Sequence, residues 1–294
     1  MIRTFAVATL LLLPLAALAD EPQCAHSEPR TLKLDVAGVR TVMFQIAQHD
    51  LVLQAGPGPS ELSGRACASR ADLLKDLAVT QRREGNKLVV RLERLNQGLG
   101  SIMSGNQYAY LDLRGTVPDN VLVQLNVGSG DASVTGAHSL SADVGSGDVK
   151  LRDIKGPVTA SIGSGDVELH GAGSLNLLQL GSGDFTATDL RGAAKIGNVG
   201  SGDVQLDGVA GDVTLGTVGS GDIDLRQVKG SVTLSTIGSG DFEVRQAGGS
   251  VTVERHGSGD VTVRDIGGNL IVRSSGSGDV THSNVRGRVE LPRR

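Results

Sequence analysis

The sequence has few aromatic side chains and no long apolar run. Among 294 residues it has no tryptophan, two tyrosines and four phenylalanines, so few rings are available to stack on a sugar or a nucleobase. The formal charge of -4 comes without a basic stripe, which makes nucleic acid a poor partner. No stretch matches the roughly 20 apolar residues of a membrane-spanning helix, so we expect no transmembrane segment in the mature chain.

The first residues have the pattern of an export signal. Met1–Ala19 contains an early arginine, an apolar stretch and a small-x-small sequence at its end. This pattern predicts a signal peptide that is cleaved between Ala19 and Asp20. We therefore expect an exported protein that is periplasmic, secreted or held at the cell surface.

Cysteine is nearly absent as well, because Cys24 and Cys67 are the only two. In an exported protein, two cysteines most simply form a disulfide. On the chain-entropy model this bridge would stabilise the fold by roughly 4 kcal/mol. A reactive or metal-binding pair is the alternative, but no CxxC motif or Cys/His cluster accompanies them.

Glycine, in contrast, is abundant, with 42 residues, and much of it lies in a repeat. The tetrapeptide Gly-Ser-Gly-Asp recurs every 17 to 19 residues, and a fixed period near 20 is typical of solenoids. We expect its glycines to supply positive φ at tight corners. The nine copies begin at Gly128, Gly145, Gly163, Gly181, Gly200, Gly219, Gly238, Gly257 and Gly276.

Each repeat unit contains two alternating apolar triplets. After Asp203 come Val204, Leu206 and Val209, and after Gly211 a second triplet follows at residues 213, 215 and 218. Alternation with period two predicts strands. We therefore predict an all-β fold, a parallel β-solenoid (β-helix) of 18–19-residue coils with two short strands per coil. A right-handed coil is expected, because parallel crossovers nearly always turn that way.

The region before the repeats is predicted to be a mainly β head that caps the solenoid. The predicted organisation is a signal peptide at 1–19, the head at 20–127 and the solenoid at 128–294. Ser69–Leu77 predicts a short helix with Ser69 and Asp72 as a capping pair, and Pro57–Pro59 and Gln97–Asn106 predict loops. The predicted head strands are Thr31–Asp35, Thr41–Ile46, Leu51–Gln54, Lys87–Leu92, Tyr108–Leu113 and Val121–Val127.

The repeats place one aspartate in each coil, and in register these would stack ~4.8 Å apart. Asx-type hydrogen bonds to backbone N–H groups one or two residues on would offset the repulsion. Exposed arginines at 152, 226, 245 and 264 would also offset it. The aspartates are Asp131, Asp148, Asp166, Asp184, Asp203, Asp222, Asp241, Asp260 and Asp279.

A calcium site on these aspartates is the sharper alternative, because calcium binds several carboxylate oxygens. The motif resembles the Gly-Gly-x-Gly-x-Asp repeat of calcium-binding toxin solenoids. It differs because the aspartate directly follows the second glycine, which turns the side chain to the other face. No cofactor is expected otherwise.

The sequence favours a protein that is not an enzyme. Carboxylates are abundant but periodic, so the repeat accounts for them without catalysis. No HExxH or GxSxG motif is present, so no catalytic residue is assigned. The histidines are scattered at His26, His49, His138, His170, His256 and His282.

The Gly-Ser-Gly-Asp-Val-x-Leu units, with Gly-x-Val-x-Leu between them and a signal peptide before them, resemble the bacterial putative-adhesin family of exported β-strand-repeat proteins. The resemblance covers roughly Thr41–Leu291 and implies an exported repeat architecture with a surface interaction. This family is largely of unknown function and has no catalytic residues to carry over.

We expect a non-enzymatic adhesin or cell-envelope module that presents a flat ladder surface. Its outward Thr, Ser, Arg, Lys and Asp ladders, such as Thr214, Thr233 and Thr252, would bind a glycan or another surface ligand. The alternatives are a calcium-binding structural solenoid and a carbohydrate-active enzyme on a β-helix. With both ends capped, the protein is expected to be a monomer.

Overall fold

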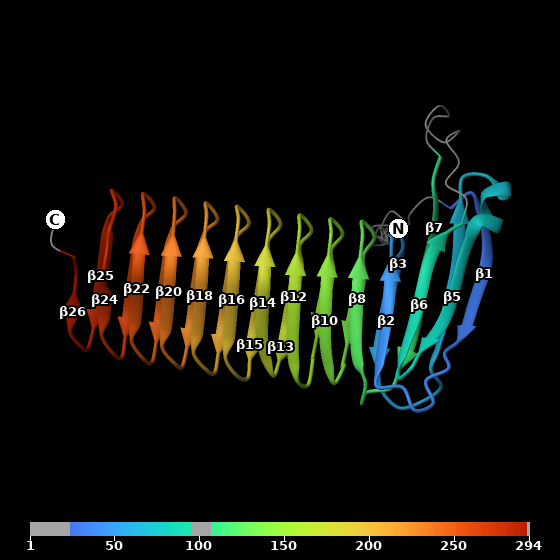
Figure 1. Ribbon diagram of the computed structural model, residues 1–294, viewed down its shortest axis with the longest axis horizontal. Helices are drawn as coiled ribbons and strands as arrows, with labels where there is room; N and C mark the ends of the chain where they lie inside the picture. The colour runs from blue at the N-terminus through green and yellow to red at the C-terminus, as the bar shows by residue number, and fades with distance from the viewer. Residues whose placement is uncertain (1–23, 96–106, 293–294) are drawn as a thin grey trace, which may run out of the picture.

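The protein is an elongated rod of two facing β-sheets, with the strands lying across its long axis (Figure 1). The structure is a computed structural model that describes residues 24–95 and 107–292. Within these ranges the only helix is a 3-10 helix, η1 (Ala71–Asp76). The predicted signal peptide and the predicted loop at 97–106 lie outside the described residues. No described helix is long and apolar enough to span a membrane.

Sheet I contains the strands that follow each ladder aspartate, together with four strands from the head. In spatial order, its described strands are β1 (His26–Lys33), β4 (Glu61–Ala68), β7 (Ala109–Val117), β3 (Asp50–Ala55), β9 (Ala132–Thr135), β11 (Val149–Arg152), β13 (Val167–Ala172), β15 (Phe185–Leu190), β17 (Val204–Val209), β19 (Ile223–Val228), β21 (Phe242–Ala247), β23 (Val261–Ile266) and β25 (Val280–Val285).

Sheet II contains the strands that precede each Gly-Ser-Gly-Asp, together with three strands from the head and the last described strand. From the head outward, its described strands are β5 (Leu77–Glu84), β6 (Lys87–Arg94), β2 (Thr41–Ile46), β8 (Leu122–Val127), β10 (Ser139–Val144), β12 (Pro157–Ile162), β14 (Ser174–Leu180), β16 (Ala194–Val199), β18 (Val213–Val218), β20 (Val232–Ile237), β22 (Val251–His256), β24 (Leu270–Val272) and β26 (Val289–Glu290).

Each coil pairs in parallel and in register with the next one. Val204 lies beside Ile223 in sheet I, and Val213 lies beside Val232 in sheet II. Both offsets equal the 19-residue step of the sequence repeat, so the predicted parallel solenoid is confirmed. Toward the C-terminus the chain rises in the near sheet of Figure 1 and descends in the far one, which makes the coil right-handed.

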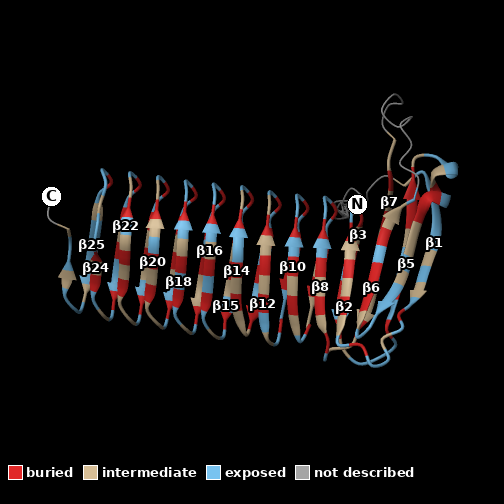
Figure 2. Ribbon diagram, viewed as in Figure 1, coloured by how far each residue is buried: buried red, intermediate tan, exposed pale blue. Residues whose placement is uncertain are grey.

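The core is a continuous column of aliphatic side chains between the two sheets. The residue after each ladder aspartate is buried in the coils from Ala132 to Val261, as is the residue two positions on. Figure 2 shows the resulting alternation of buried and outward positions along each strand. A single coil could not bury these side chains, so stacking supplies the stability of the repeat.

The glycines of Gly-Ser-Gly-Asp are required for close backbone approach, whereas the positive φ expected of glycine at tight corners occurs elsewhere in the repeat, at Gly136, Gly171 and Gly208. None of the Gly-Ser-Gly-Asp glycines has a φ in the left-handed region. The second glycine of each motif lies against the backbone of the preceding coil. A Cβ on Gly221 would be 1.9 Å from the carbonyl oxygen of Gly202, and one on Gly240 would be 1.9 Å from that of Gly221.

The head does not precede the solenoid as a separate layer, because its strands continue both sheets. β2 and β3 form the coil on which β8 and β9 stack. β6 and β7 flank that same coil on its other side. The chain therefore passes from β7 to β8 across the β2–β3 coil. Beyond β7 and β6, the antiparallel strands β4, β1 and β5 close the N-terminal end.

The structure confirms part of the predicted head and corrects the rest. The six predicted strands overlap β1, β2, β3, β6, β7 and β8, but β4 and β5 were not predicted. A helical turn is present, although Ser69 does not cap it. Arg70 is the N-cap residue and makes no side-chain capping bond, and the Ser69 hydroxyl accepts the N–H of Tyr108 instead. Pro57–Pro59 is a loop, as predicted.

The predicted disulfide between Cys24 and Cys67 is present, with the Cα atoms 5.2 Å apart. Cys67 lies in β4, whose strand pairs with β1, so the bridge fastens the first described residue to the sheet that caps the rod.

In the β2–β3 coil, His49 occupies the position that the second glycine of Gly-Ser-Gly-Asp occupies in the later coils. Ala47–Asp50 occupies the corner that Gly-Ser-Gly-Asp occupies in later coils, because a Cβ on Gly130 would meet the His49 carbonyl oxygen at 2.0 Å. The His49 ring is fully buried, and its Nδ1 accepts the N–H of Leu111 at 3.2 Å. Burial and the Arg94 charge lower the pKa of His49 from 6.5 to about 4.

Replacing Gly221 with alanine should destabilise the rod by about 3 kcal/mol or more, since the clash is with backbone that cannot move without disturbing the next coil. Gly56→Ala is the control, because a Cβ at Gly56 meets nothing within 4 Å. Chemical denaturation should show a large loss for Gly221→Ala alone. Equal midpoints for the two variants would contradict the close-approach argument.

The low pKa of His49 should make folding stability depend on pH. The unfolded chain binds the His49 proton below pH 6.5, whereas the folded chain resists it until about pH 4, so stability is lost as the pH falls through this window. Between pH 7 and pH 4.5 the expected loss is about 2 kcal/mol. In His49→Asn, whose amide oxygen can still accept the Leu111 N–H, this part of the pH dependence should disappear. An unchanged pH profile of urea unfolding would refute the assignment.

Candidate binding surfaces along the solenoid

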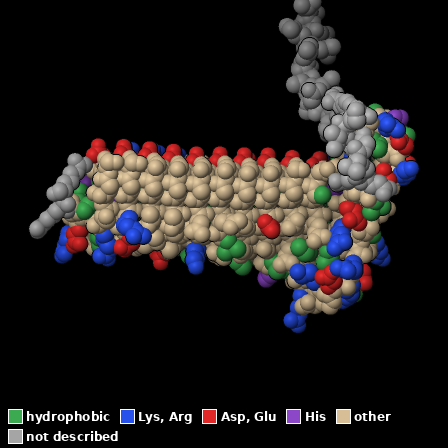
Figure 3. Space-filling view, turned by 45° about the horizontal axis from the view of Figure 1, so that its top comes forward, with side chains coloured by type: hydrophobic (Ala, Val, Ile, Leu, Met, Phe, Trp, Pro, Cys, Tyr) green, Lys and Arg blue, Asp and Glu red, His purple; other side chains and the backbone are tan. Residues whose placement is uncertain are grey.

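The aspartate ladder runs along the turn edge of the rod, where Figure 3 shows a row of acidic side chains. From Asp131 to Asp260, each carboxylate accepts the backbone N–H of the aspartate in the next coil. The Asp241 N–H donates to Asp222 at 2.8 Å, and the Asp260 N–H donates to Asp241 at 2.8 Å. The expected bonds to backbone N–H groups therefore exist, but they join neighbouring coils instead of residues one or two positions on.

Asp50 extends this ladder into the head, a member that the repeat motif did not reveal. Its carboxylate accepts the N–H of Asp131 at 3.3 Å. Burial raises the pKa of Asp50, while the Asp131 hydrogen bond acts in the opposite direction. The sequence signal was an aspartate directly before the alternating segment Leu51–Gln54, without the glycines that mark the later copies.

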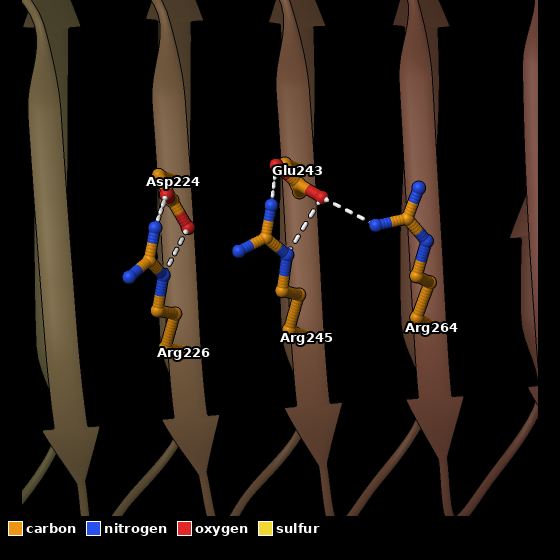
Figure 4. A network of polar contacts seen from close by, with 5 residues as sticks. All are labelled: Asp224, Arg226, Glu243, Arg245 and Arg264. Carbon is orange, nitrogen blue, oxygen red and sulfur yellow. Dashed lines mark hydrogen bonds and ion pairs between the residues drawn. The ribbon is translucent and has the colours of Figure 1, made fainter.

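Three of the four arginines that were expected to neutralise the ladder pair with other carboxylates. Arg226 binds Asp224, and both Arg245 and Arg264 contact Glu243 (Figure 4). These pairs lie on the outer face of sheet I, within one strand or between adjacent strands. The ladder aspartates are therefore stabilised by backbone N–H groups, and the Arg226, Arg245 and Arg264 pairs form a separate surface.

The ladder does not form a metal site in the described part of the chain. No three His, Cys, Asp or Glu side chains are grouped there as a metal ion would require. The aspartates stand in single file on an exposed edge, and each carboxylate from Asp131 to Asp260 already accepts a backbone N–H. The calcium alternative gains no support from this arrangement.

The ladders of threonine, arginine and aspartate that were expected to form one flat surface lie on different sides of the rod. Thr214, Thr233 and Thr252 are in register on the outer face of sheet II, as expected. The arginine positions 226, 245 and 264 project from sheet I on the opposite side, and the aspartates occupy the turn edge. These ladders therefore cannot contact one ligand on a common face.

The histidines do not assemble into a catalytic arrangement among the described residues. His170 comes closest, because its Nδ1 is 2.6 Å from the Thr188 hydroxyl and 3.7 Å from Asp189. Both contacts use the same ring nitrogen, so the imidazole cannot relay a proton between them. His256 is buried and its Nδ1 contacts the carbonyl oxygen of Gly259.

Positive φ recurs once per coil, five residues after each ladder aspartate. The glycine, aspartate or asparagine found there in most coils suits the left-handed conformation, a signal that the repeat analysis missed. Glutamine does not suit it, yet Gln227 and Gln246 adopt φ values of 53° and 63°. The nine positions are Gly136, Asp153, Gly171, Asp189, Gly208, Gln227, Gln246, Asp265 and Asn284.

A groove of about 750 Å³ follows this corner of the solenoid from Asp189 to Arg286. Gln227 and Gln246 line it and are exposed, and neither amide has a hydrogen-bond partner among the described residues. The next residue of each coil, such as Val228, is buried and anchors the groove to the core. The groove therefore runs parallel to the rod axis and repeats its polar groups from coil to coil.

Two cations with two glycines between them lie along the other side of the groove. Lys229 and Arg286 are exposed and make no ion pair within the described residues. Between them, Gly248 and Gly267 carry no side chain, which leaves this wall open. The groove thus offers amide and cationic donors to an extended ligand.

The solenoid also matches a protein family. Residues 154–268 match the family model described as "Putative auto-transporter adhesin, head GIN domain". These coils are similar to that family. The match confirms the resemblance to the putative-adhesin family that the sequence motifs indicated. No curated protein matches the chain.

Solved bacterial structures resemble the chain over most of its length, at low identity. A "putative lipid binding protein" from Parabacteroides distasonis has 16% identity and a TM-score of 0.46, and covers 91% of this chain and 98% of its own. A "putative adhesin" from Bacteroides fragilis has 15% identity and a TM-score of 0.34, and covers 88% and 98%. With TM-scores below 0.5, these likenesses carry no argument about function.

The ladder hydrogen bonds predict different effects for two substitutions of Asp222. Asp222→Ala should cost about 1 kcal/mol because the Asp241 N–H loses its acceptor. Asp222→Asn keeps an acceptor oxygen and removes one of the stacked charges, so its stability should equal or exceed that of the native protein. Thermal denaturation at low salt measures both. A destabilised Asp222→Asn would show that the charge itself is needed.

Proposed function

We propose that this protein is an exported, non-enzymatic adhesin module that binds a linear glycan along the corner groove. The similarity of residues 154–268 to the adhesin family model supports the general role, and the Cys24–Cys67 disulfide is consistent with an oxidising compartment outside the cytoplasm. Under this proposal the protein acts in the periplasm, outside the cell or at the cell surface.

The observation that carries the proposal is the strain at Gln227 and Gln246. A non-glycine residue in the left-handed region costs about 1 kcal/mol or more, and Gly208 shows that glycine is accepted at the same position of the preceding coil. Both glutamines line the groove, and their amides have no hydrogen-bond partner among the described residues, which favours a role of these amides in binding a ligand.

The groove favours a polymer with regularly spaced polar groups. Successive coils place their side chains ~4.8 Å apart along a straight line, so an extended ligand can make the same kind of contact repeatedly. The donors present are amides, lysine and arginine, which suit sugar hydroxyl groups. With so few aromatic residues in the chain, ring stacking contributes little, and affinity would come from many weak hydrogen bonds along the groove.

The same geometry argues against the carbohydrate-active alternative. Adjacent ladder carboxylates approach the separation found in retaining glycosidases, which is about 5 Å. They lie on an exposed turn edge, however, and not in the groove, so a sugar bound there would not reach them. The groove itself contains Asp189 and Asp265 in coils that are not adjacent.

The double variant Gln227→Gly/Gln246→Gly should make the protein more stable and weaken glycan binding. Relief of two strained residues should raise stability by about 2 kcal/mol. Loss of two amide contacts worth about 1 kcal/mol each should weaken binding roughly 30-fold. Binding is measured by affinity electrophoresis in gels that contain neutral dextran or anionic alginate, and stability by thermal denaturation.

Asp153→Gly is the matched control, because Asp153 adopts the same conformation with a φ of 54° but lies outside the groove. It should leave glycan binding unchanged. If the glutamine variant becomes more stable and keeps full affinity, the groove is not the binding site. If neither polysaccharide retards the native protein, the glycan assignment fails.

A further inference from the structure

Three arginines in register border the corner groove on its sheet I side. Arg226, Arg245 and Arg264 lie side by side on β19, β21 and β23 (Figure 4). Each of them directly precedes a residue that lines the groove, so the arginine row follows the groove over three successive coils. The lining residues that follow the arginines are Gln227, Gln246 and Asp265.

In the first two arginines, a carboxylate of the same strand occupies one edge of the guanidinium group. Arg226 donates from Nε and Nη2 to Asp224, at 3.2 and 2.5 Å. Arg245 donates from the same two atoms to Glu243, at 2.7 and 2.6 Å. In both strands the carboxylate stands two residues before the arginine, on the same face. Each pair is therefore a bidentate contact closed within one strand.

Arg264 lacks such a carboxylate, because Thr262 stands at the equivalent position of its strand. Its Nη1 donates instead to Glu243 on the neighbouring strand, at 3.3 Å. The Nε and Nη2 atoms of Arg264 have no hydrogen-bond partner among the described residues, and the side chain is 48% exposed. The guanidinium edge that binds a carboxylate in the two preceding coils is therefore open in this coil.

The charges around this open edge favour an anion. Three guanidinium groups share two carboxylates, so the arginine row carries a net positive charge. The groove lining adds three cationic side chains and only two carboxylates. One of these carboxylates, Asp265, accepts the Asn284 amide at 2.6 Å and forms no ion pair with Arg264 in the described part of the chain. An acidic group at the edge of Arg264 would thus meet mainly positive charge.

We propose that the glycan bound along the groove is acidic, and that Arg264 and Thr262 bind one of its carboxylate or sulfate groups. This group takes the place that Glu243 takes beside Arg245, accepting from Nε and Nη2 of Arg264. The Thr262 hydroxyl supplies a further donor. The inference rests on the proposed function, because it names the class of glycan that the groove binds.

The open edge acts together with the groove. An exposed ion pair alone contributes little, because water and salt screen it. On a polymer already held along the groove, the acidic group is delivered at a high effective concentration, so the same contact adds to the affinity. Hydrogen bonds to charged groups are stronger than those between neutral ones, and an acidic polymer should bind about tenfold more tightly than a neutral one.

Affinity electrophoresis in gels that contain dextran, dextran sulfate or polygalacturonate tests this preference, with each mobility referred to a gel without polysaccharide. The native protein should be retarded at about tenfold lower concentrations of an acidic polymer than of dextran. Retardation by polygalacturonate identifies a carboxylate as the bound group, and retardation by dextran sulfate identifies a sulfate.

Two substitutions should abolish the preference by different routes. Arg264→Gln removes the charge and the paired donors. Thr262→Glu keeps Arg264 but gives it the carboxylate that Arg245 already has, so the edge is filled by the protein itself. Arg152→Gln is the matched control, because Arg152 is exposed at the equivalent position of a coil outside the groove lining. All three changes shift the formal charge equally, yet Arg152→Gln should keep the preference.

The outcomes separate this inference from the proposed function. Equal retardation of the native protein by dextran and by the acidic polymers would overturn the inference and leave the glycan proposal standing. No retardation by any of the polymers would remove both. A preference that survives in Arg264→Gln or Thr262→Glu, or that is lost equally in Arg152→Gln, would also overturn the inference. Thermal denaturation confirms that each variant is folded, and either of the first two suffices for the comparison.

Discussion

The distance between stacked backbones at the Gly-Ser-Gly-Asp corner is the constraint on which the rest of the structure depends. The second glycine of each motif is so close to the preceding coil that a Cβ would overlap its carbonyl oxygen. Because this contact recurs in each coil, it sets the distance and the alignment between successive coils. The in-register strands, the aspartate ladder and the straight groove all follow from that stacking. In the head, His49 stands at the position of the second glycine, and its buried ring accepts the N–H of Leu111.

The repeat region could be predicted in detail because local pattern and global fold coincide there. The period of the motif became the pairing register, and the alternating apolar residues became the core. The head was predicted less well. β5 carries several charged residues that hide its alternation, although its partner β6 follows it directly. β4 carries Gly64 and depends on the antiparallel partners β1 and β7, which are far away in sequence. Periodicity contains no information about such partners.

The candidate groove was not predicted, for a different reason. It depends on a backbone conformation, and the sequence position that adopts it holds glycine, aspartate, asparagine or glutamine. A change of residue type at one position of a repeat resembles ordinary variation until the φ values are known. The same holds for the ladder bonds, whose acceptors were expected within one turn but lie one coil away. In both cases the missing information was the three-dimensional neighbour of each residue.

The path of the chain through the head has a consequence for how the rod assembles. The coil formed by β2 and β3 lies between β6–β7 on one side and β8–β9 on the other, although it precedes both in sequence. In each sheet it therefore pairs along both edges, with the head strands β6 and β7 on one side and with the first solenoid strands β8 and β9 on the other. Each later coil stacks in register on the coil before it, so all of them are aligned through this first coil. An error of register at Thr41–Ala55 would be copied into every later coil, so the accuracy of the whole rod rests on its first turn.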